Sequence, residues 1–539
     1  MPLLADLNQL LIHDDGLSNA EQQRLSRAVA DGELRRLARG LYTADLTTPE
    51  TEFIRHHIWE IVALFIPDGL LVDRSAAGFG RISPDGRLYV ASKSRSRDLS
   101  LPGTTIVVRP GAPLESDAPW IGGLRLSSPQ RILIDNLARS TSSPEVLSRT
   151  LSKAELHDYA ALLRTELGDG PFREIRAALP ETADLLGVPH RTKAADAIMG
   201  AALGTRTIRG ASRQLAATGA GRPFDPKRIE AFTRFANHLE AYPYDEAVPR
   251  FLAAGDPGKT SELAFFEAYY SNYIEGTIFE LDEAIDIVYK NEIPTRRPAD
   301  AHDIAGTYAV VCDAVDKAKT TNDPSEFIEI IAARHARMMV GRPEIGPGVF
   351  KDKRNQVGTY VFVEPTLVEG TLRQAVPIIA SLSEPLARAA ATLFILTEVH
   401  PFNDGNGRVA RIAMNAELSH AGGSRIVVPI VYRNEFVSAL RAGSVDANPN
   451  ALMRVLAFAW KWTSQMDFSS LALARQLVTF TNADVDSTVA ERTGTTLLLP
   501  ADRKAPAVRA GTTSAAATKP PTMNPQPPGS QWLHGILQD

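Results

Sequence analysis

The stretch that most constrains this chain is residues 400–411, His-Pro-Phe-Asn-Asp-Gly-Asn-Gly-Arg-Val-Ala-Arg. It brings a base, a carboxylate, a glycine turn and two arginines together over a short distance. Residues 384–399 before it are rich in Ala, Leu, Phe and Ile, which predicts a buried helix. Pro401 ends that helix, because a proline disfavours the helical conformation of the residue before it. We therefore expect His400 at a helix end, with its imidazole in a loop.

A second helix is expected directly after this loop and should end at Gly422. Apolar residues that share one helical face predict it: Val409, Ile412, Ala413 and Ala416. Gly405 and Gly407 then lie at the N-terminus of this helix, where unpaired backbone N–H groups bind anions. Arg408 and Arg411 are three residues apart, so both side chains are expected to lean over the same anion. The pattern predicts a phosphate-binding turn.

Three further side chains complete this prediction. Asp404 suits a Mg²⁺ ion that is shared with phosphates. His400 suits a general base, because the unperturbed pKa of histidine is about 6.5. Phe402 is expected to fill the core and hold the loop rigid. Taken alone, each of these features is more often structural; their conjunction favours chemistry on a polyphosphate.

Eight positions match the pattern His-x-Phe-x-Asp/Glu-Gly-Asn-Gly-Arg-x-x-Arg: His400, Phe402, Asp404, Gly405, Asn406, Gly407, Arg408 and Arg411. The stretch therefore resembles the signature of the Fic family of nucleotidyltransferases. The resemblance implies a protein adenylyltransferase. Such an enzyme uses ATP with Mg²⁺ to transfer AMP to a Ser, Thr or Tyr hydroxyl of a target protein, itself included, and releases pyrophosphate.

By this resemblance, His400 would take the hydroxyl proton, Asp404 would hold the metal and Arg411 would bind the γ-phosphate. The α- and β-phosphates would be bound by the residues of the turn: Gly405, Asn406, Gly407 and Arg408. This assignment is chemically sensible, because phosphoryl-type transfer needs little beyond positioning, charge neutralisation and a proton acceptor.

Residues 271–276, Ser-Asn-Tyr-Ile-Glu-Gly, resemble the inhibitory motif Ser/Thr-x-x-x-Glu-Gly/Asn that many Fic proteins carry. Its inhibitory residues would be Ser271, Glu275 and Gly276. A glutamate in the last turn of a helix meets the negative end of the helix dipole, so Glu275 should gain from an external cation. By resemblance that cation is Arg411, and the ion pair would take the place of the γ-phosphate. The alternative is that Glu275 is an ordinary helix-end residue.

Residues 348–357, Gly-Val-Phe-Lys-Asp-Lys-Arg-Asn-Gln-Val, resemble the flap hairpin of this family. The flap aligns the main chain of the target over the active site by strand addition. Gly348, Lys351 and Val357 are the candidate docking residues. The family more often has Arg at the position of Lys351, a change that a surface hairpin tolerates. The alternative is an ordinary hairpin bounded by glycine.

Composition limits the class of protein. The chain has 539 residues, enough for about three domains, and its formal net charge of −5 argues neither for nor against nucleic acid. Its one cysteine, Cys312, lies in an apolar helical pattern and is expected in the core. A disulfide framework is excluded, which agrees with a reducing cytoplasm. The sequence has no signal-peptide pattern and no apolar run of about 18 residues, so we expect a soluble cytoplasmic protein without a membrane partner.

The N-terminal region differs from the rest. Residues 33–43 are basic and resemble the wing of a winged helix, in which Arg35, Arg36 and Arg39 are candidate DNA contacts. With residues 49–65, 73–77 and 128–135, this run resembles the antitoxin-like transcription-regulator module AbiEi, over roughly residues 1–185. The alternative is a solvated hairpin without a nucleic-acid role.

Local patterns in this region also predict secondary structure. We expect helices over residues 2–12 and 18–30 and strands over residues 88–91 and 104–108.

The predicted fold class is multi-domain: an α-helical Fic core with a small β-hairpin flap, preceded by an α+β region that contains the winged helix. Residues 1–85 would form the winged-helix-like module, and residues 86–185 an α+β region with a helical connector. The Fic catalytic domain would span residues 190–467, with its inhibitory helix at about 261–276. Residues 468–539 would form a C-terminal segment, largely disordered from about 503 because Ala, Pro, Thr, Ser and Gly dominate it.

The leading functional hypothesis is an autoinhibited protein adenylyltransferase coupled to DNA binding by the N-terminal module. One alternative is a DNA-binding transcriptional regulator or antitoxin-like protein whose Fic domain only senses nucleotide. Another keeps the fold but removes AMP from a modified target or transfers a different nucleotide. The presence of both His400 and Asp404 favours the enzyme, because a sensor needs neither a base nor a metal ligand.

Overall fold

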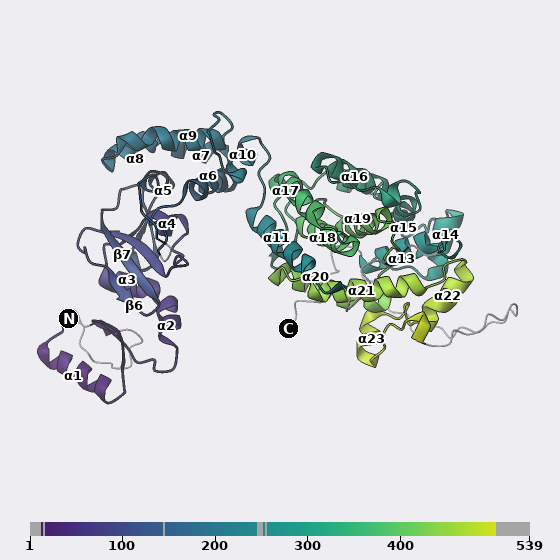
Figure 1. Cartoon of the computed structure of the whole chain (residues 1–539), viewed down its shortest axis with the longest axis horizontal. Coiled ribbons are helices and arrows are strands. Elements are labelled where there is room, and N and C mark those ends of the chain that lie inside the picture. The colour runs from purple at the N-terminus through teal and green to yellow at the C-terminus, as the bar shows by residue number, and fades with distance from the viewer. Residues whose placement is uncertain (1–11, 14–16, 144–145, 245–251, 254–255, 503–539) are drawn as a thin grey trace. The chain divides into compact units, whose positions relative to one another are not determined.

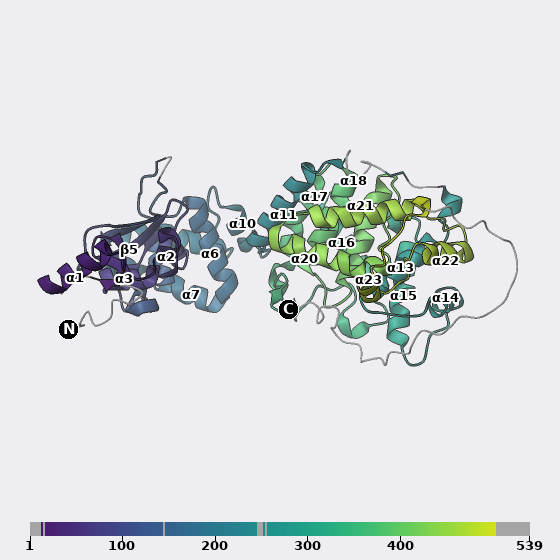
Figure 2. The same cartoon turned by 90° about the horizontal axis from the view of Figure 1, so that it is seen from below.

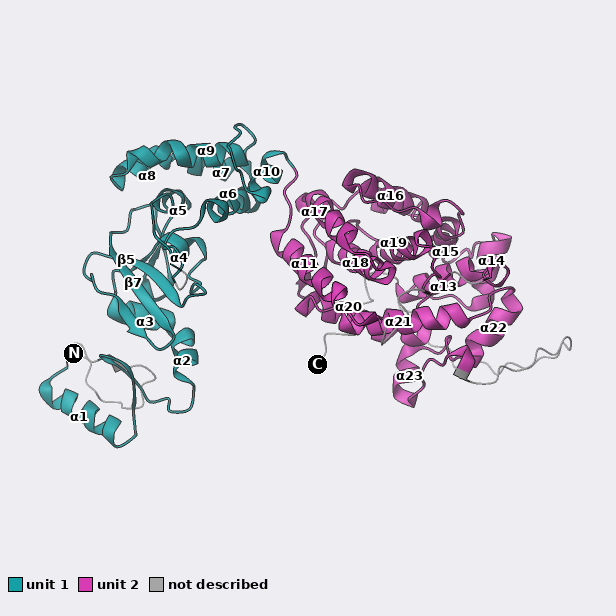
Figure 3. Cartoon of the chain, viewed as in Figure 1, with its two compact units in different colours: residues 1–221 teal, residues 222–539 magenta. Residues whose placement is uncertain are grey.

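The computed structural model describes residues 12–13, 17–143, 146–244, 252–253 and 256–502 (Figure 1). It divides into two compact units, Met1–Gly221 and Arg222–Asp539 (Figure 3). The sequence predictions for residues 2–11 and 503–539 lie outside the described residues. No described helix combines the length and the apolar character that a membrane crossing requires.

The N-terminal unit begins with a small antiparallel sheet and one helix. Strands β1 (Ile12–His13), β3 (Leu41–Thr43) and β2 (Arg35–Ala38) lie side by side in that order, and α1 (Asn19–Ala30) connects β1 to β2 along the chain. Helix α1 starts as predicted, at a capping box formed by Ser18 and Glu21. The basic run forms the β2–β3 hairpin, which turns at Gly40 with a φ of +83°. The hairpin is confirmed; its role as a DNA-binding wing stays a prediction.

A mixed six-stranded sheet follows, in the order β6-β7-β5-β4-β9-β8. Its strands are β4 (Leu70–Leu71), β5 (Arg87–Ser92), β6 (Leu99–Leu101), β7 (Thr104–Pro110), β8 (Ala118–Pro119) and β9 (Arg125–Leu126). The two predicted strands are β5 and β7, which pair in parallel. Strand β4 pairs with both β5 and β9. The predicted domain boundary at residue 85 therefore falls inside one hydrogen-bonded sheet.

Helices cover this sheet and continue into a helical cluster. Those at the sheet are α2 (Glu50–His56), α3 (Ile58–Phe65), α4 (Asp73–Ala77) and α5 (Pro129–Asp135). Those of the cluster are α6 (Lys153–Leu167), α7 (Asp169–Ala177), α8 (Leu179–Leu185), α9 (Thr192–Ala202) and α10 (Arg213–Gly219). Residues of α9 and α10 pack in the same apolar core as those of α6 to α8. The predicted start of the catalytic domain at residue 190 is thus displaced, because α9 and α10 belong to the N-terminal unit.

The second unit is built around two successive helices, α18 (Pro385–Val399) and α19 (Asn406–His420), which lie at its centre (Figure 1). The flanking helices are α11 (Pro226–Glu240), α15 (Pro298–Val311), α16 (Pro324–Met338), α17 (Val368–Ser381), α20 (Arg433–Asp446) and α21 (Asn450–Gln465). Nearly every side chain of α18 is buried, as its apolar composition predicts. Helix α19 is buried just as fully, although only one apolar face was predicted for it. Cys312, predicted in the core, is instead exposed, because it caps the C-terminus of α15.

The helix predicted to carry the inhibitory motif is α13 (Leu263–Ile274), and most of its surface is buried. The C-terminal helices α22 (Leu471–Phe480) and α23 (Ser487–Thr493) pack on α13 and share an apolar core with it (Figure 2). Helix α14 (Leu281–Lys290) contributes to the same core. Residues 468–499 therefore pack in the core of the second unit, whereas the sequence analysis set residues 468–539 apart as a C-terminal segment.

Candidate active site

His400 lies at the end of α18, as Pro401 predicts. Its φ and ψ of 51° and 61° are left-handed, and its ring stacks on Phe362 with 3.9 Å between ring centroids. The Nδ1 atom lies 3.1 Å from the carbonyl oxygen of Thr397. A carbonyl only accepts, so Nδ1 carries the proton and Nε2 is the free base. Burial lowers the pKa of His400 to about 4, which keeps the imidazole neutral at physiological pH.

The loop after His400 is closed by Asn406 and Phe402. The amide side chain of Asn406 accepts from the backbone N–H of Phe402 and donates to its carbonyl, both at 2.8 Å. The ring of Phe402 is fully buried, which confirms that it fills the core. Asn406 was predicted to bind phosphate, and both polar groups of its side chain are engaged inside the loop. Only its backbone N–H, in the first turn of α19, is left for that role.

His335 of α16 also shapes the loop, and the sequence prediction missed it. Its ring stacks on Phe402 at 3.9 Å between centroids. Its Nε2 lies 3.0 Å from the carbonyl of Asp404, and its Nδ1 accepts from the N–H of Gly348 at 2.8 Å. Burial lowers the pKa of His335 to about 4, so the neutral ring can donate at one nitrogen and accept at the other. His335 thus ties the start of the predicted flap to the motif loop.

The two arginines of the motif face different partners. Arg408 forms a buried ion pair with Asp303 of α15, at 2.8 Å, and lies 3.2 Å from the side-chain oxygen of Asn272. Arg411 donates to the Ser271 hydroxyl at 3.0 Å and to the Ser271 carbonyl at 2.8 Å. A buried aspartate thus engages Arg408, and the expectation that both arginines lean over one anion stays a prediction.

Glu275 forms the ion pair that the sequence predicted. Helix α13 ends at Ile274, Glu275 caps it, and Gly276 has a φ of +88°. A carboxylate oxygen of Glu275 lies 2.7 Å from a guanidinium nitrogen of Arg411. A Cβ placed on Gly407 would lie only 2.1 Å from the same carboxylate oxygen. The Glu275 carboxylate thus lies against the first turn of α19, where the sequence predicts an anion.

Comparison with known proteins agrees with this geometry. The model of the Fic/DOC family matches residues 327–418, which run from α16 to the last turn of α19. Residues 327–418 are therefore a Fic/DOC domain.

Relatives of the Fic domain are distant. Protein adenylyltransferase fic-1 of Caenorhabditis elegans is 25% identical over 198 residues, which cover 35% of this chain and 38% of the relative. Protein adenylyltransferase Fic of Drosophila erecta is 26% identical over 237 residues, 42% of this chain and 45% of the relative. The chain spans about two fifths of the length of these curated relatives. A solved structure of Fic-1 from C. elegans (residues 134–508) aligns over 60% of this chain and 92% of that one, with 17% identity and a TM-score of 0.32.

Asp404 is the predicted metal ligand of the Fic domain. Its side chain is 52% exposed, and one carboxylate oxygen accepts from the N–H of Gly405 at 2.7 Å. The second carboxylate oxygen lies 3.8 Å from Arg408. Among the described residues, no group of three or more His, Cys, Asp or Glu side chains is placed to hold a metal. A single exposed carboxylate fits a cation whose other ligands are phosphate oxygens and water.

The flap of the Fic domain differs from the prediction. The hairpin is formed by β10 (Gln356–Val357) and β11 (Tyr360–Val361), so of the three candidate docking residues only Val357 lies in it. Gly348 precedes the hairpin and bonds to His335. Lys351 was expected on a surface hairpin but is 3% exposed. Its long side chain runs under the loop, where it reaches a backbone carbonyl oxygen.

A charged cluster that the sequence prediction missed anchors this hairpin. Arg228 of α11 donates to the carbonyl of Val361 at 2.7 Å and bonds to the Tyr360 hydroxyl and to Glu398. Tyr360 also bonds to Glu398, which is 2% exposed and lies two residues before His400. The hairpin is thus tied to the end of α18. Partners separated by more than a hundred residues leave no local signal in the sequence.

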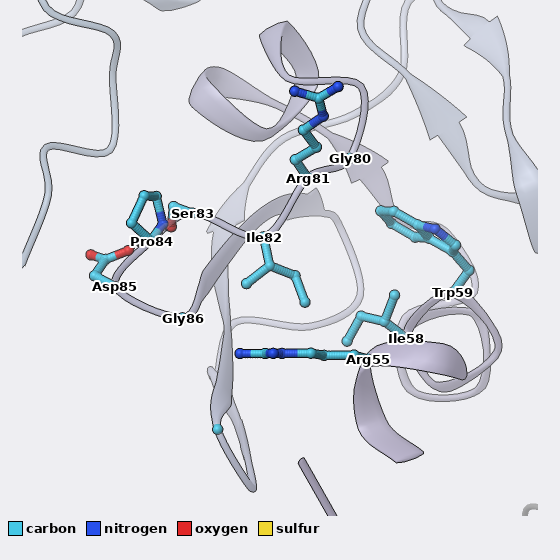
Figure 4. A pocket seen from close by; sticks show the side chains of 11 residues that line it. Arg55, Ile58, Trp59, Gly80, Arg81, Ile82, Ser83, Pro84, Asp85 and Gly86 are labelled. Atoms are coloured by element: carbon cyan, nitrogen blue, oxygen red, sulfur yellow. Dashed lines mark hydrogen bonds between the residues drawn. The ribbon is translucent and has the colours of Figure 1, made fainter. Parts of the chain in front are cut away.

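The candidate DNA contacts lie on the β2–β3 hairpin of the N-terminal unit. Arg36 and Arg39 are exposed, whereas Arg35 is partly buried and donates to the carbonyl of Thr48 at 2.7 Å. The same unit has a cavity of about 770 Å³ between α2, α3 and the loop of residues 80–86, lined by Arg55 and Trp59 among others (Figure 4). All of its lining residues belong to the N-terminal unit, so this cavity is separate from the Fic site.

Proposed function

We propose that this chain is an autoinhibited protein adenylyltransferase, which transfers AMP from ATP to a Ser, Thr or Tyr hydroxyl of a protein and releases pyrophosphate. One observation carries the proposal: a neutral histidine with a free Nε2 ends one helix, and the anion-binding N-terminus of the next helix begins five residues later at Gly405. The names of the relatives, protein adenylyltransferases, support the same reaction.

The residues of the site divide the reaction between them. Nε2 of His400 takes the proton of the target hydroxyl while the hydroxyl oxygen bonds to the α-phosphorus. The bond from the α-phosphorus to the oxygen bridging to the β-phosphate breaks, and pyrophosphate leaves. The backbone N–H groups of Asn406 and Gly407 in the first turn of α19, with Arg411, neutralise the charge on the phosphates. The protein mainly supplies position, charge and a proton acceptor, which suffices for this class of transfer.

Magnesium fits the carboxylate of Asp404, since Mg²⁺ binds nucleotides through one or two protein carboxylates together with phosphate oxygens and water. The ion would supply charge neutralisation on the phosphates. Asp404 is held for this role by its bond to the N–H of Gly405 and by the His335 contact to its carbonyl.

Autoinhibition is part of the proposal. The Glu275 carboxylate neutralises Arg411 and lies against Gly407, where a phosphate oxygen would need to approach. A second anion at this place would be repelled by Glu275 and deprived of Arg411. The resting chain would therefore bind ATP poorly or in an unproductive position.

The reaction is tested with the full chain carrying Glu275→Gly, cell lysate and ATP labelled at the α-phosphate. We expect label on proteins and, by mass spectrometry, AMP on Ser, Thr or Tyr side chains. ATP labelled at the γ-phosphate is the control, because only phosphate transfer would use that label. Label from the γ-position alone, or no label from either, would rule out adenylyl transfer. Parallel reactions with other α-labelled nucleotides identify the transferred nucleotide.

DNA binding by the N-terminal unit is a second candidate function, supported by the exposed Arg36 on strand β2 and the exposed Arg39 at the turn of the β2–β3 hairpin. If both contact phosphates, the double change to alanine in the full chain should weaken binding to duplex DNA. It should also lower the slope of log affinity against log salt by about two. Arg213→Ala, an exposed arginine of α10, is the matched control. Binding that is absent, or insensitive to salt and to these changes, would remove the DNA-binding candidate.

A further inference from the structure

The backbone of His400 is held in an unusual conformation. With a φ of 51°, His400 is one of the few non-glycine residues of the described chain in the left-handed region. This conformation costs a residue with a Cβ roughly 1–2 kcal/mol. It persists only when the surrounding structure fixes it, and such strain is typical of functional sites. The contacts that fix the peptide groups on each side of His400 therefore matter for its imidazole.

Lys351 binds the carbonyl oxygens on both sides of His400. Its ammonium donates to the carbonyl of Val399, the preceding residue, at 3.3 Å. Its backbone N–H donates to the carbonyl of Pro401, the following residue, at 2.8 Å. One residue from outside the motif thus bonds to the peptide group before His400 and to the peptide group after Pro401.

Asn355 extends this arrangement by one residue. Its side-chain oxygen accepts from the Lys351 ammonium at 2.5 Å, and its side-chain nitrogen donates to the carbonyl of Phe402 at 3.0 Å. Lys351 and Asn355, together called the brace, therefore bond to the carbonyls of Val399, Pro401 and Phe402. Lys351 and Asn355 bond to each other, and each also bonds to backbone carbonyls around His400, so this stretch is held at several points.

Packing alone does not explain a lysine here. The side chain of Lys351 is 3% exposed, and burying its charged group costs more than burying an apolar side chain of similar length. Burial lowers the pKa of Lys351 to about 7, and both the ammonium and the neutral amine keep N–H donors for the Val399 carbonyl. Lys353, two residues away, is exposed and faces solvent as an ordinary surface lysine.

We propose that Lys351 is a positioning residue that acts through Asn355 to hold His400 in the left-handed conformation, from which Nε2 faces the reacting hydroxyl. The expected loss of kcat rests on the proposed transfer reaction. The expected change in the conformation of His400 does not. Lys351 touches no nucleotide-binding residue of the motif in the contacts above, so its loss should disturb the chemical step rather than the binding of ATP. Small misplacements of a reacting group can lower a rate by up to about 100-fold.

The kinetic test uses the full chain with Glu275→Gly, so that transfer is measurable, and compares Lys351→Met, Lys351→Arg and Lys353→Met. We expect Lys351→Met to lower kcat by about tenfold or more while KM for ATP changes less than twofold. Lys351→Arg should restore kcat to within about threefold, because arginine can donate to the same carbonyl. Lys353→Met should have no effect. An unchanged kcat in Lys351→Met, or an equal loss in Lys353→Met, overturns the inference.

A second measurement separates this inference from the transfer reaction. In the chain with Glu275 intact and ¹⁵N-labelled histidine, the side-chain signals of His400 should report a proton on Nδ1. Lys351→Met should shift these signals or average the two tautomers, while Lys353→Met leaves them unchanged. If Lys351→Met fails to fold, Asn355→Ala, which removes the other half of the brace, takes its place. Unchanged His400 signals in a folded brace variant overturn the inference. If the His400 signals shift but no variant transfers AMP, the inference about Lys351 holds and the proposed reaction is contradicted.

Discussion

Glu275→Gly is expected to raise the rate of AMP transfer by roughly 10- to 100-fold, because the change frees Arg411 and clears the first turn of α19. The Glu275 carboxylate lies 2.7 Å from Arg411, and both side chains are mostly buried. A charge-assisted hydrogen bond of this kind contributes about 1.5–3 kcal/mol, and about 1.4 kcal/mol corresponds to tenfold. The gain should appear both as tighter ATP binding, measured by calorimetry, and as faster labelling from α-labelled ATP.

Two further variants test whether the carboxylate itself inhibits. Glu275→Gln keeps the shape but removes the charge, so it should release much of the inhibition. Glu292→Gly changes an exposed glutamate of the same unit and should leave the rate as it was. A Glu275→Gly chain that transfers no faster than the unchanged chain would show that the ion pair is only structural.

The sequence correctly predicted the features that depend on neighbouring residues, namely helices, helix ends and the loop between them. A proline after His400, glycines at 405 and 407 and apolar residues at helical spacing sufficed to place two helices and the loop between them. The helix end at Glu275 was also local, because a glycine at 276 caps it. Pairing Glu275 with Arg411, 136 residues later, came from a family resemblance rather than from any local signal.

Contacts between side chains that are far apart in the sequence could not be predicted from it. Arg408 was read with Arg411 because the two are neighbours on a helix, yet Asp303 of another helix pairs with Arg408. Lys351 was read as a surface residue because lysine is usually exposed, and only the fold reveals the carbonyl groups beneath it. His335 looks like a lone histidine on a helix, and its partners at 348 and 404 come together only in three dimensions.

The C-terminal layer shows the same limit at the scale of domains. Helix α13 presents Ser271, a predicted inhibitory residue, on the side that meets α19, and its other side packs against α22 and α23. The hydroxyl of Tyr273 donates to the Asp486 carboxylate at 3.1 Å, next to the start of α23. The apolar partners of α13 thus lie some two hundred residues later, which composition alone could not reveal. The position of Glu275 consequently depends on both layers that enclose its helix.

His400→Ala, made in the Glu275→Gly chain, is expected to lower the rate of transfer by about 100- to 10,000-fold, the range associated with loss of a general base. The free Nε2 of the neutral ring is the proton acceptor, and alanine offers none. ATP binding should persist, because its predicted contacts are the backbone of the glycine turn and Arg411. Calorimetry of ATP binding and labelling from α-labelled ATP measure the two effects separately.

The pH profile gives an independent check on the same residue. A base must be unprotonated to act, and burial lowers the pKa of His400 to about 4. Transfer in the Glu275→Gly chain should therefore persist as the pH falls below about 6.5, the unperturbed value for histidine, and be lost only as it approaches the lowered pKa. His420→Ala, an exposed histidine of α19, is the matched control and should leave both rate and profile unchanged. Label that survives in His400→Ala, with the same pH profile, would mean that another group accepts the proton.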